Sequence, residues 1–351
     1  MPIILGILFH TIGGIASGSF YMPFKQVKAW SWEVFWLFGG LFSWLIAPFI
    51  AAWLTVPDFN GIIGAAETEV KTFTYLMGLL WGIGGLTYGL GVRYLGMSLG
   101  NSVVLGFCSA FGSLVPSIYY SLYPAEGKTG IVAMAQHPGG QMVLFGVMVC
   151  LAGIAVTGRA GMRKERELTT DQKTAATAEF SLVKGLTIAV ISGILSSFFN
   201  FGIESGKPMA EQAVLHGANP LFQNNVTYIV VLWGGLTTNL LWCAYLMWKN
   251  RSFGDFGKKG APNTRNALYS AFAGTLWFLQ FFFYGMGESR LGNGASSWIL
   301  HMATIILTAN AWGIWLKEWK GVSQATFRTF LLGLALIMAS IFLVGIGNSM
   351  Q

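Results

Sequence analysis

Four ionisable side chains interrupt apolar stretches of this 351-residue sequence and could carry a proton through an apolar medium. His10 and His301 each lie well inside such a stretch, and histidine exchanges protons near neutral pH. Glu204 and Glu288 lie near the ends of two others. Charged groups are costly in hydrocarbon, so all four are candidates for proton coupling. The alternatives are a neutral histidine bonded to a backbone carbonyl and a carboxylate that faces water.

Aromatic and amide side chains form a second pattern, which suits a neutral sugar. Trp277, Gln280 and Tyr284 lie at i, i+3 and i+7, which is one face of a helix. Rings stack on the apolar faces of sugars and amides bond their hydroxyls, so this stripe predicts a binding site. Further candidates for the same site are Trp81, Tyr88, Asn200 and Asn239. The alternatives are an interfacial belt for the tryptophans and helix-to-helix hydrogen bonds for the amides.

Apolar length places these residues in membrane-spanning helices. The chain is 54% hydrophobic and 10% charged, which leaves too little polar surface for an ordinary soluble domain. About 20 apolar residues cross a bilayer as a helix. The sequence predicts ten such spans, near residues 3–23, 34–54, 73–92, 98–120, 140–158, 182–203, 222–248, 268–288, 294–316 and 327–347. The predicted fold class is therefore an all-α integral membrane protein with ten transmembrane helices.

The basic residues predict the orientation and the division of the chain. Most of the 21 Lys and Arg residues lie in loops that follow odd-numbered spans. The positive-inside rule then places these loops in the cytoplasm and both termini outside. Residues 159–181 include the one strongly charged stretch, and we expect a cytoplasmic linker there. It separates a first five-helix half, 1–158, from a second, 182–351.

An internal repeat relates the two halves. GLLWGIGGLTYGLGVRYLG (78–96) aligns with GTLWFLQFFFYGMGESRLG (274–292), with eight identical residues that include a Trp and a Tyr at the same spacing. The two copies are five spans apart, so they cross the membrane in opposite directions, as in the inverted repeats of secondary transporters. Such halves predict alternating access to a site between them. Gln280 and Phe281 replace two glycines of the first copy, so we expect the second copy to make more of the substrate contacts.

Seven distinctive stretches, spread from the first span to the last, are similar to one known family. They are FYMPFKQVKAWSWE (20–33), WGIGGLTYGLGVRYLGMSLG (81–100), GKPM (206–209), LWFLQFFFYGMGESR (276–290), SWILHM (297–302), LKEW (316–319) and VGIGN (344–348). They resemble the bacterial L-rhamnose/proton symporter family of the drug/metabolite transporter superfamily. This resemblance implies proton-driven uptake of L-rhamnose or a related 6-deoxyhexose across the bacterial inner membrane. It also adds Trp298, which falls in a matching stretch, to the candidate sugar site.

Two other functions compete with sugar symport. The first alternative function is that of another drug/metabolite carrier, a metabolite exporter or exchanger. Exchange of a nucleotide-linked sugar would need cations within the membrane, and no Lys or Arg lies near the centre of a predicted span. An intramembrane hydrolase is the other, because Ser297 and His301 lie at i and i+4. No oriented carboxylate or oxyanion arrangement accompanies this pair. We expect no enzymatic activity, catalytic residue, cofactor or metal; the expected partners are the sugar, protons and membrane lipid, with no nucleic acid.

Overall fold

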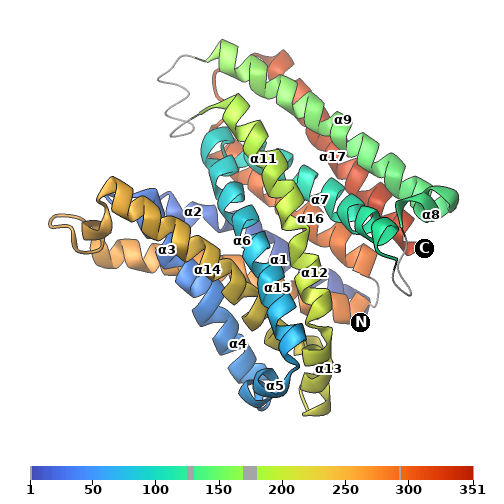
Figure 1. Ribbon diagram of the computed structural model, residues 1–351. Coiled ribbons are helices and arrows are strands. Elements are labelled where there is room, and N and C mark those ends of the chain that lie inside the picture. The colour runs from blue at the N-terminus through green and yellow to red at the C-terminus, as the bar shows by residue number, and fades with distance from the viewer. Residues whose placement is uncertain (1, 125–129, 169–179, 292–293, 351) are drawn as a thin grey trace. The chain divides into compact units, whose positions relative to one another are not determined.

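The computed structural model describes residues 2–124, 130–168, 180–291 and 294–350, and the regular elements in these ranges are helices (Figure 1). Among the described residues, nine segments are long and apolar enough to cross a membrane: Ile4–Phe24, Trp32–Thr55, Thr68–Leu95, Met97–Leu122, Pro138–Glu167, Leu182–Leu215, Pro220–Asn250, Asn263–Arg290 and Gln324–Gly347. Each coincides with a predicted span. The predicted span 294–316 is also a helix, α16 (Gly294–Trp315), but it is not among these nine. The helical membrane-protein class is thus consistent with the structure.

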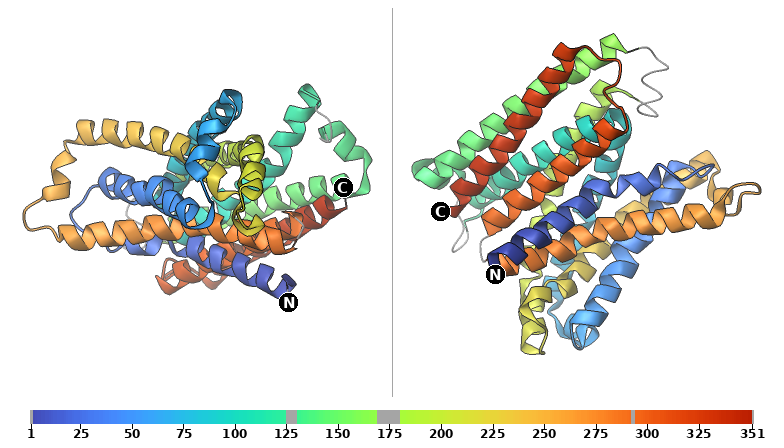
Figure 2. Two further views of the ribbon diagram at one scale, coloured as in Figure 1. Left: turned by 90° about the horizontal axis from the view of Figure 1, so that it is seen from below. Right: turned by 180° about the vertical axis from the view of Figure 1, so that it is seen from behind.

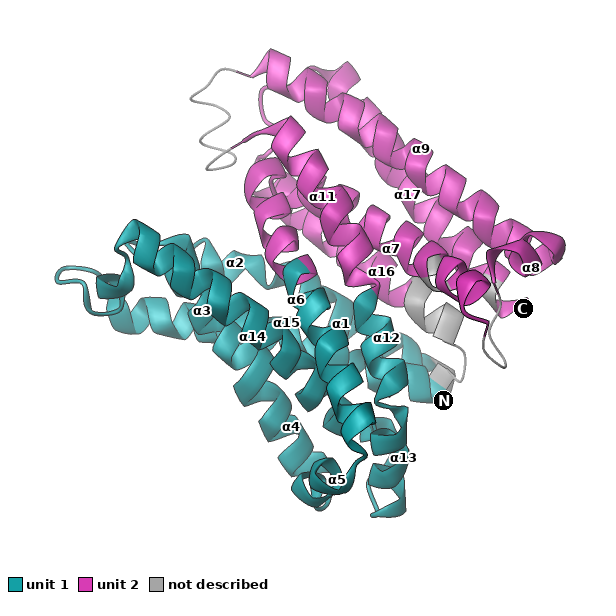
Figure 3. Ribbon diagram, in the orientation of Figure 1, with its two compact units in different colours: residues 1–83, 198–290 teal, residues 84–197, 291–351 magenta. Residues whose placement is uncertain are grey.

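The chain forms two compact units, which are described separately (Figure 3). Unit 1 contains residues 1–83 and 198–290, and unit 2 contains residues 84–197 and 291–351. Each unit therefore takes chain from both sides of the predicted linker. The predicted halves, 1–158 and 182–351, were defined from the sequence and the orientation of the spans, whereas the two units are defined by contacts. The two divisions are therefore different, and the halves stay a prediction.

Unit 1 is held together by close contacts of α14 with its neighbours. Its elements are α1 (Pro2–Ser19), α2 (Tyr21–Phe24), α3 (Trp32–Leu41), the π-helical η1 (Phe42–Ile46), α4 (Ala47–Thr55), α5 (Phe59–Ala65), the first part of α6 (Thr68–Leu95), α12 (Phe198–Ser205), α13 (Lys207–Leu215), η2 (Pro220–Phe222), α14 (Asn225–Asn250), η3 (Phe253–Gly257) and α15 (Asn263–Leu291). Helix α14 packs on α3, η1 and α4. It also meets α6 at Gly78, where an added Cβ would lie 1.9 Å from the Val231 carbonyl oxygen. Glycine is needed there for the two backbones to approach.

Unit 2 is built around a long antiparallel pair, α9 and α17, which run side by side in Figures 1 and 2. Its elements are the second part of α6, α7 (Met97–Leu122), α8 (Ile131–Gln136), α9 (Pro138–Glu167), α11 (Leu182–Ser196), α16 and α17 (Gln324–Ser349). Gly139, Gly146 and Gly153 recur every seven residues on α9 and face α17. A Cβ on any of them would come within 3.0 Å of an α17 atom, so small residues set the helix spacing.

Helix α9 continues past residue 158, where the sequence predicted the start of the linker. It ends at Glu167, so its last turns contain much of the charge of the predicted linker. A helix can continue through charged residues where it leaves the hydrocarbon. Two of the charged residues in these last turns contact other parts of unit 2. Lys164 is buried, with Nζ 4.7 Å from the centroid of the Trp319 ring, and Glu167 binds the start of α17. Residues 169–179 of the predicted linker lie outside the described residues.

Contacts within each unit define the relative directions of the helices. In unit 1, His10 lies near Gly287 and Ser17 near Gln280, so α1 and α15 are antiparallel. In unit 2, the Ser102–Asn310 hydrogen bond and the Met97–Glu318 hydrogen bond make α7 and α16 antiparallel. Both directions match the predicted alternation of odd- and even-numbered spans.

Candidate functional site

Helices α1 and α15 of unit 1 bring together polar residues that are far apart in the sequence; the two helices lie side by side in Figure 2. The hydroxyl of Ser17, which is buried, donates to Oε1 of Gln280 at 2.8 Å. Nε2 of Gln280 donates to the carbonyl of Trp277 at 3.0 Å. An amide and a hydroxyl that bind each other between two helices can exchange this hydrogen bond for bonds to the hydroxyls of a ligand.

His10 is the second polar contact between the same helices. It lies about two turns before Ser17 on α1 and is fully buried. Its ring meets the Tyr284 ring edge-on, with the centroids 5.3 Å apart. Gly287 makes room for it, because an added Cβ there would lie 2.5 Å from Nε2 of His10. The imidazole therefore sits against α15 at the level of residues 284–287.

Glu288 extends this contact into a cluster of titratable groups. It is half-buried and lies one turn after Tyr284 on α15. Its carboxylate interacts electrostatically with Tyr284 and with Tyr228 of α14. The Tyr228 hydroxyl lies against α15, 3.4 Å from where a Cβ on Gly285 would be. We call His10, Tyr228, Tyr284 and Glu288 the titratable cluster; an imidazole, two phenols and a carboxylate are groups that can hold or transfer a proton.

Aromatic rings surround the other end of the predicted stripe. The Trp277 ring lies 5.5 Å from that of Trp81, 6.0 Å from that of Trp44 and 5.0 Å from that of Phe281, measured between centroids. Phe199 of α12 completes the group, at 4.9 Å from Trp81 and 4.5 Å from Phe281. These five residues form the aromatic cluster. Gln280 lies on α15 one turn after Trp277 of the aromatic cluster and one turn before Tyr284 of the titratable cluster. The two clusters also meet directly, because the Tyr228 ring packs on those of Phe281 and Phe199 at 5.9 and 6.4 Å between centroids.

Asn239, a predicted sugar ligand, binds neighbouring helices. It is fully buried, and its Oδ1 accepts a hydrogen bond from Nε1 of Trp36 at 2.9 Å. Its Nδ2 donates to the carbonyls of Gly82 and Gly235 at 3.2 and 2.8 Å. Both donors and the acceptor of the amide are therefore engaged by α3, α6 and α14. This arrangement favours the helix-to-helix alternative.

Two predicted residues of α12 face away from the clusters. Asn200 and Glu204 are both exposed, whereas their neighbour Phe199 belongs to the aromatic cluster. One face of α12 therefore joins the aromatic cluster, and the predicted amide and carboxylate do not.

The remaining predicted residues belong to unit 2. The Tyr88 hydroxyl donates to Oδ1 of Asn101. His301 is buried in α16, so the two predicted histidines lie in different units. Trp298 lies on α16, but its side chain is outside the described residues.

Ser17 and Tyr228 are candidate site residues that the sequence did not single out. Ser17 lies in a run of small residues that is typical of helix packing, although it is seven residues after His10 and hence on the same helical face. Tyr228 lies within an apolar run of the seventh predicted span. Among the described residues, no group of three or more His, Cys, Asp or Glu side chains is placed to hold a metal ion. The groups gathered at the site can form hydrogen bonds, stack on a ligand and exchange protons.

Ionisable and amide side chains buried within apolar spans are typical of membrane transport proteins, and this is the class that the fold and the site indicate. Comparison with known sequences agrees with that class. Residues 1–350 match the sequence model of the family described as L-rhamnose-proton symport protein (RhaT). The chain belongs to this family, and the resemblance carried by the seven stretches is confirmed.

Curated relatives match the chain over nearly its whole length. The L-rhamnose-proton symporter of Pectobacterium atrosepticum is 37% identical over 351 residues, covering 99% of this chain and 98% of the relative. The L-rhamnose-proton symporter of Yersinia pestis (strain Pestoides F) is 38% identical over 350 residues, covering 98% of both chains. That of Yersinia pseudotuberculosis serotype O:1b matches to the same extent. This is a family of symporters, so the chain is a multi-pass membrane transporter rather than an enzyme.

Proposed function

We propose that this protein takes up L-rhamnose or a related 6-deoxyhexose across the bacterial inner membrane together with a proton. The observation that carries this proposal is the α1–α15 pair, on which a hydrogen-bonded Ser17 and Gln280 lie one turn from Trp277 of the aromatic cluster and one turn from Tyr284 of the titratable cluster. One helix, α15, thus presents stacking, hydrogen-bonding and proton-carrying groups in succession. The names of the curated relatives support both the sugar and the proton.

Sugar binding is assigned to the middle of α15. Trp277 offers a ring for the apolar face of a deoxyhexose, and Gln280 with Ser17 offers an amide and a hydroxyl for the sugar hydroxyls. Trp81 lies against Trp277 and shapes the same wall. Tyr88, Asn200 and Trp298 stay candidates from the sequence. Asn239 is the weakest candidate, because its amide is engaged by neighbouring helices.

Proton coupling is assigned to the titratable cluster. Glu288 is its one carboxylate, and Tyr284 links it to His10: the Tyr284 ring packs on the His10 ring and interacts electrostatically with Glu288. A half-buried carboxylate can be neutralised by a proton, which removes the cost of its charge in an apolar setting. His301 remains a second candidate within unit 2, and the exposed Glu204 is the weakest of the four.

Alternating access is proposed to follow from ten helices arranged as two inverted repeats, with both termini outside. Two observations support the repeat. Trp81 and Trp277 occupy equivalent positions of the two copies and contact each other, as equivalent residues near a two-fold axis do. Predicted equivalent spans also pack together: α3 and α4 with α14, α7 with α16, and α9 with α17.

Uptake into proteoliposomes tests the proposal. The purified protein is reconstituted, an outside-acid pH gradient is imposed, and accumulation of labelled L-rhamnose and L-fucose is measured with and without a protonophore. We expect accumulation above equilibrium that the protonophore abolishes. If no 6-deoxyhexose accumulates while the gradient persists, the proposed function is wrong.

A further inference from the structure

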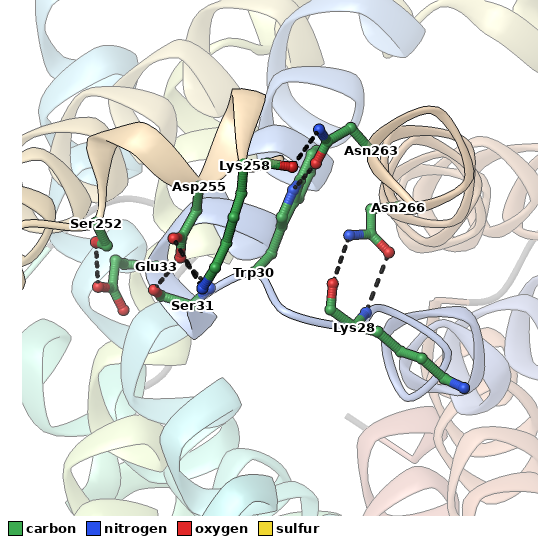
Figure 4. Close-up of polar contacts among 9 residues, drawn as sticks. All are labelled: Lys28, Trp30, Ser31, Glu33, Ser252, Asp255, Lys258, Asn263 and Asn266. Carbon is green, nitrogen blue, oxygen red and sulfur yellow. Dashed lines mark hydrogen bonds and ion pairs between the residues drawn. The ribbon is translucent and has the colours of Figure 1, made fainter. Parts of the chain in front are cut away.

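A group of exposed cations gathers at one end of unit 1, outside the site described above. It comes from the chain between α2 and α3 and from the end of α14, the start of α15 and the chain that joins them; the two connecting segments lie together in Figure 4. The cations, all exposed, are Lys25, Lys28, Lys249, Arg251, Lys258, Lys259 and Arg265. We call these seven residues the basic platform. By the predicted orientation it lies on the cytoplasmic side.

Hydrogen bonds hold the two connecting segments in a defined arrangement. The backbone N–H of Lys28 donates to Oδ1 of Asn266 at 3.1 Å, and the Lys28 carbonyl accepts from Nδ2 of the same side chain at 2.7 Å (Figure 4). Nε1 of Trp30 donates to Oδ1 of Asn263 at 2.9 Å, and the Trp30 ring packs on Phe256 at 5.6 Å between centroids. The platform cations are therefore carried on ordered backbone.

The acidic residues among the cations are turned toward the protein. Glu33 is buried and accepts hydrogen bonds from Ser252 Oγ at 2.6 Å and Asn250 Nδ2 at 3.0 Å. Asp255 accepts from the Ser31 N–H at 2.8 Å and pairs with Lys258 at 3.9 Å. The carboxylates of Glu33 and Asp255 thus hold the connecting segments together through hydrogen bonds, and the exposed surface of the platform is predominantly positive.

Exposed aromatic side chains flank the platform where α14 ends. Trp248 is 72% exposed and directly precedes Lys249, and Phe253 is 53% exposed. Tryptophan collects at the headgroup level of a bilayer, so its position next to Lys249 places the cations at the height of lipid phosphates. Arg265, in the first turn of α15, lies at the corresponding end of the next helix.

We propose that the basic platform is a binding site for anionic phospholipid headgroups of the phosphatidylglycerol type. Clustered cations next to a membrane-spanning helix attract anionic lipid. Orientation by the positive-inside rule needs only the presence of cations in a loop. Ordering the segments, in contrast, costs conformational entropy, and the hydrogen bonds of Asn263 and Asn266 offset this cost by holding the segments that carry the cations together.

Lipid titration of the purified full-length chain tests this assignment. Pyrene-labelled phosphatidylglycerol or phosphatidylcholine is added in neutral-detergent micelles, and energy transfer from tryptophan to pyrene reports binding. We expect Lys249→Gln with Lys259→Gln to weaken phosphatidylglycerol binding about tenfold and to leave phosphatidylcholine unchanged. The matched control is Lys71→Gln with Lys207→Gln, two exposed or half-buried lysines of the same unit outside the platform, and it should stay within about twofold.

The ordered arrangement is tested by Asn263→Ala, which keeps every cation. We expect about threefold weaker phosphatidylglycerol binding, because the Trp30 contact is lost and the segment loosens. Equal losses in the platform and control lysine variants would overturn the site, and so would displacement of the lipid by millimolar inorganic phosphate. Unchanged binding in the Asn263→Ala variant would overturn the role of the hydrogen bonds. Sugar uptake is not part of this readout, so the result is independent of the proposed function.

Discussion

Unit 1 and unit 2 both pack some helices through glycine, as at Gly78 of unit 1, but the contacts around the candidate site of unit 1 differ from those of the α9–α17 pair of unit 2. In unit 1, α15 meets its neighbours through Trp277, Gln280 and Tyr284, which are large or polar and half-buried. In unit 2, α9 meets α17 through glycines such as Gly153, with aliphatic side chains around them. Backbone-to-backbone packing leaves few groups for a ligand. We infer that unit 1 carries the chemistry and that the α9–α17 pair of unit 2 acts as a scaffold.

One type of contact is common to both units. A carboxylate at or just beyond the end of one helix binds the start of its neighbour. In unit 1, Asp255 accepts from the N–H of Ser31 at 2.8 Å. In unit 2, Glu318 accepts from the N–H groups of Met97 and Ser98 at 2.9 and 3.0 Å, and Glu167 accepts from the N–H of Ser323 at 2.6 Å. Each carboxylate complements the partial positive charge of a helix start. By the predicted orientation, all three contacts lie on the cytoplasmic side.

The largest expected effect concerns which of the two units holds the proton site. One pH unit corresponds to about 1.4 kcal/mol, so each coupled proton supports about tenfold accumulation of sugar. We expect Glu288→Gln to abolish accumulation while preserving counterflow of labelled sugar, because the amide cannot cycle a proton. His301→Gln in unit 2 and Glu204→Gln on α12 should retain accumulation. Loss of accumulation in His301→Gln but not in Glu288→Gln would move the chemistry to unit 2.

The scaffold role of unit 2 predicts a large loss of stability from added volume between α9 and α17. A Cβ at Gly333 would lie 2.2 Å from the Thr157 hydroxyl and 2.7 Å from its backbone nitrogen. Gly333→Val should therefore destabilise the protein by about 1–3 kcal/mol, seen as a lower midpoint of thermal unfolding in detergent. Gly85→Ala is the matched control, because its Cβ would meet no atom within 4 Å. Equal unfolding midpoints for the two variants would contradict the close packing of this pair.

Within unit 1, Gln280 and Asn239 separate substrate binding from helix packing. Gln280→Ala should raise the KM for sugar by about tenfold, since one or two hydrogen bonds to a neutral ligand are lost. It should lower thermal stability less than Asn239→Ala, because Ser17 alone loses its partner on another helix. Asn239→Ala should lower stability by about 1–3 kcal/mol and leave the KM near that of the unchanged protein, because its buried partners lose their bonds. Reversed outcomes would exchange the roles of the two amides.

The smallest expected effects concern the carboxylates at the helix starts. Glu318 is fully buried, and Glu318→Gln should cost about 1 kcal/mol because a neutral amide complements the α7 start less well. Thermal unfolding at low and high salt measures this. Glu167→Gln, at a more exposed position, should give a smaller loss that salt removes. A larger effect from Glu167 would mean that burial does not decide the strength of these contacts.

The candidate site was predictable along α15 and only in part across it. The spacing of Trp277, Gln280 and Tyr284 placed them on one helical face, because side-chain direction follows directly from helix periodicity. The internal repeat singled out Trp81 on another helix, but Ser17 was not predicted, because no local pattern selects one serine among many. Asn239 shows the converse: an amide in an apolar span suits either a ligand or a neighbouring helix, and only its contacts distinguish them.

The sequence by itself determined the helical membrane class, nine of the spans and the family, because bilayer thickness sets a length of apolar chain that can be counted locally. It also indicated which residues are unusual in such a setting. Only the tertiary structure decided that His10 packs on Tyr284 and Gly287, that Ser17 binds Gln280, and that α9 continues to Glu167. The physical reason is that these contacts join residues far apart in the chain, and their strength depends on how closely glycine and aromatic side chains let the helices approach.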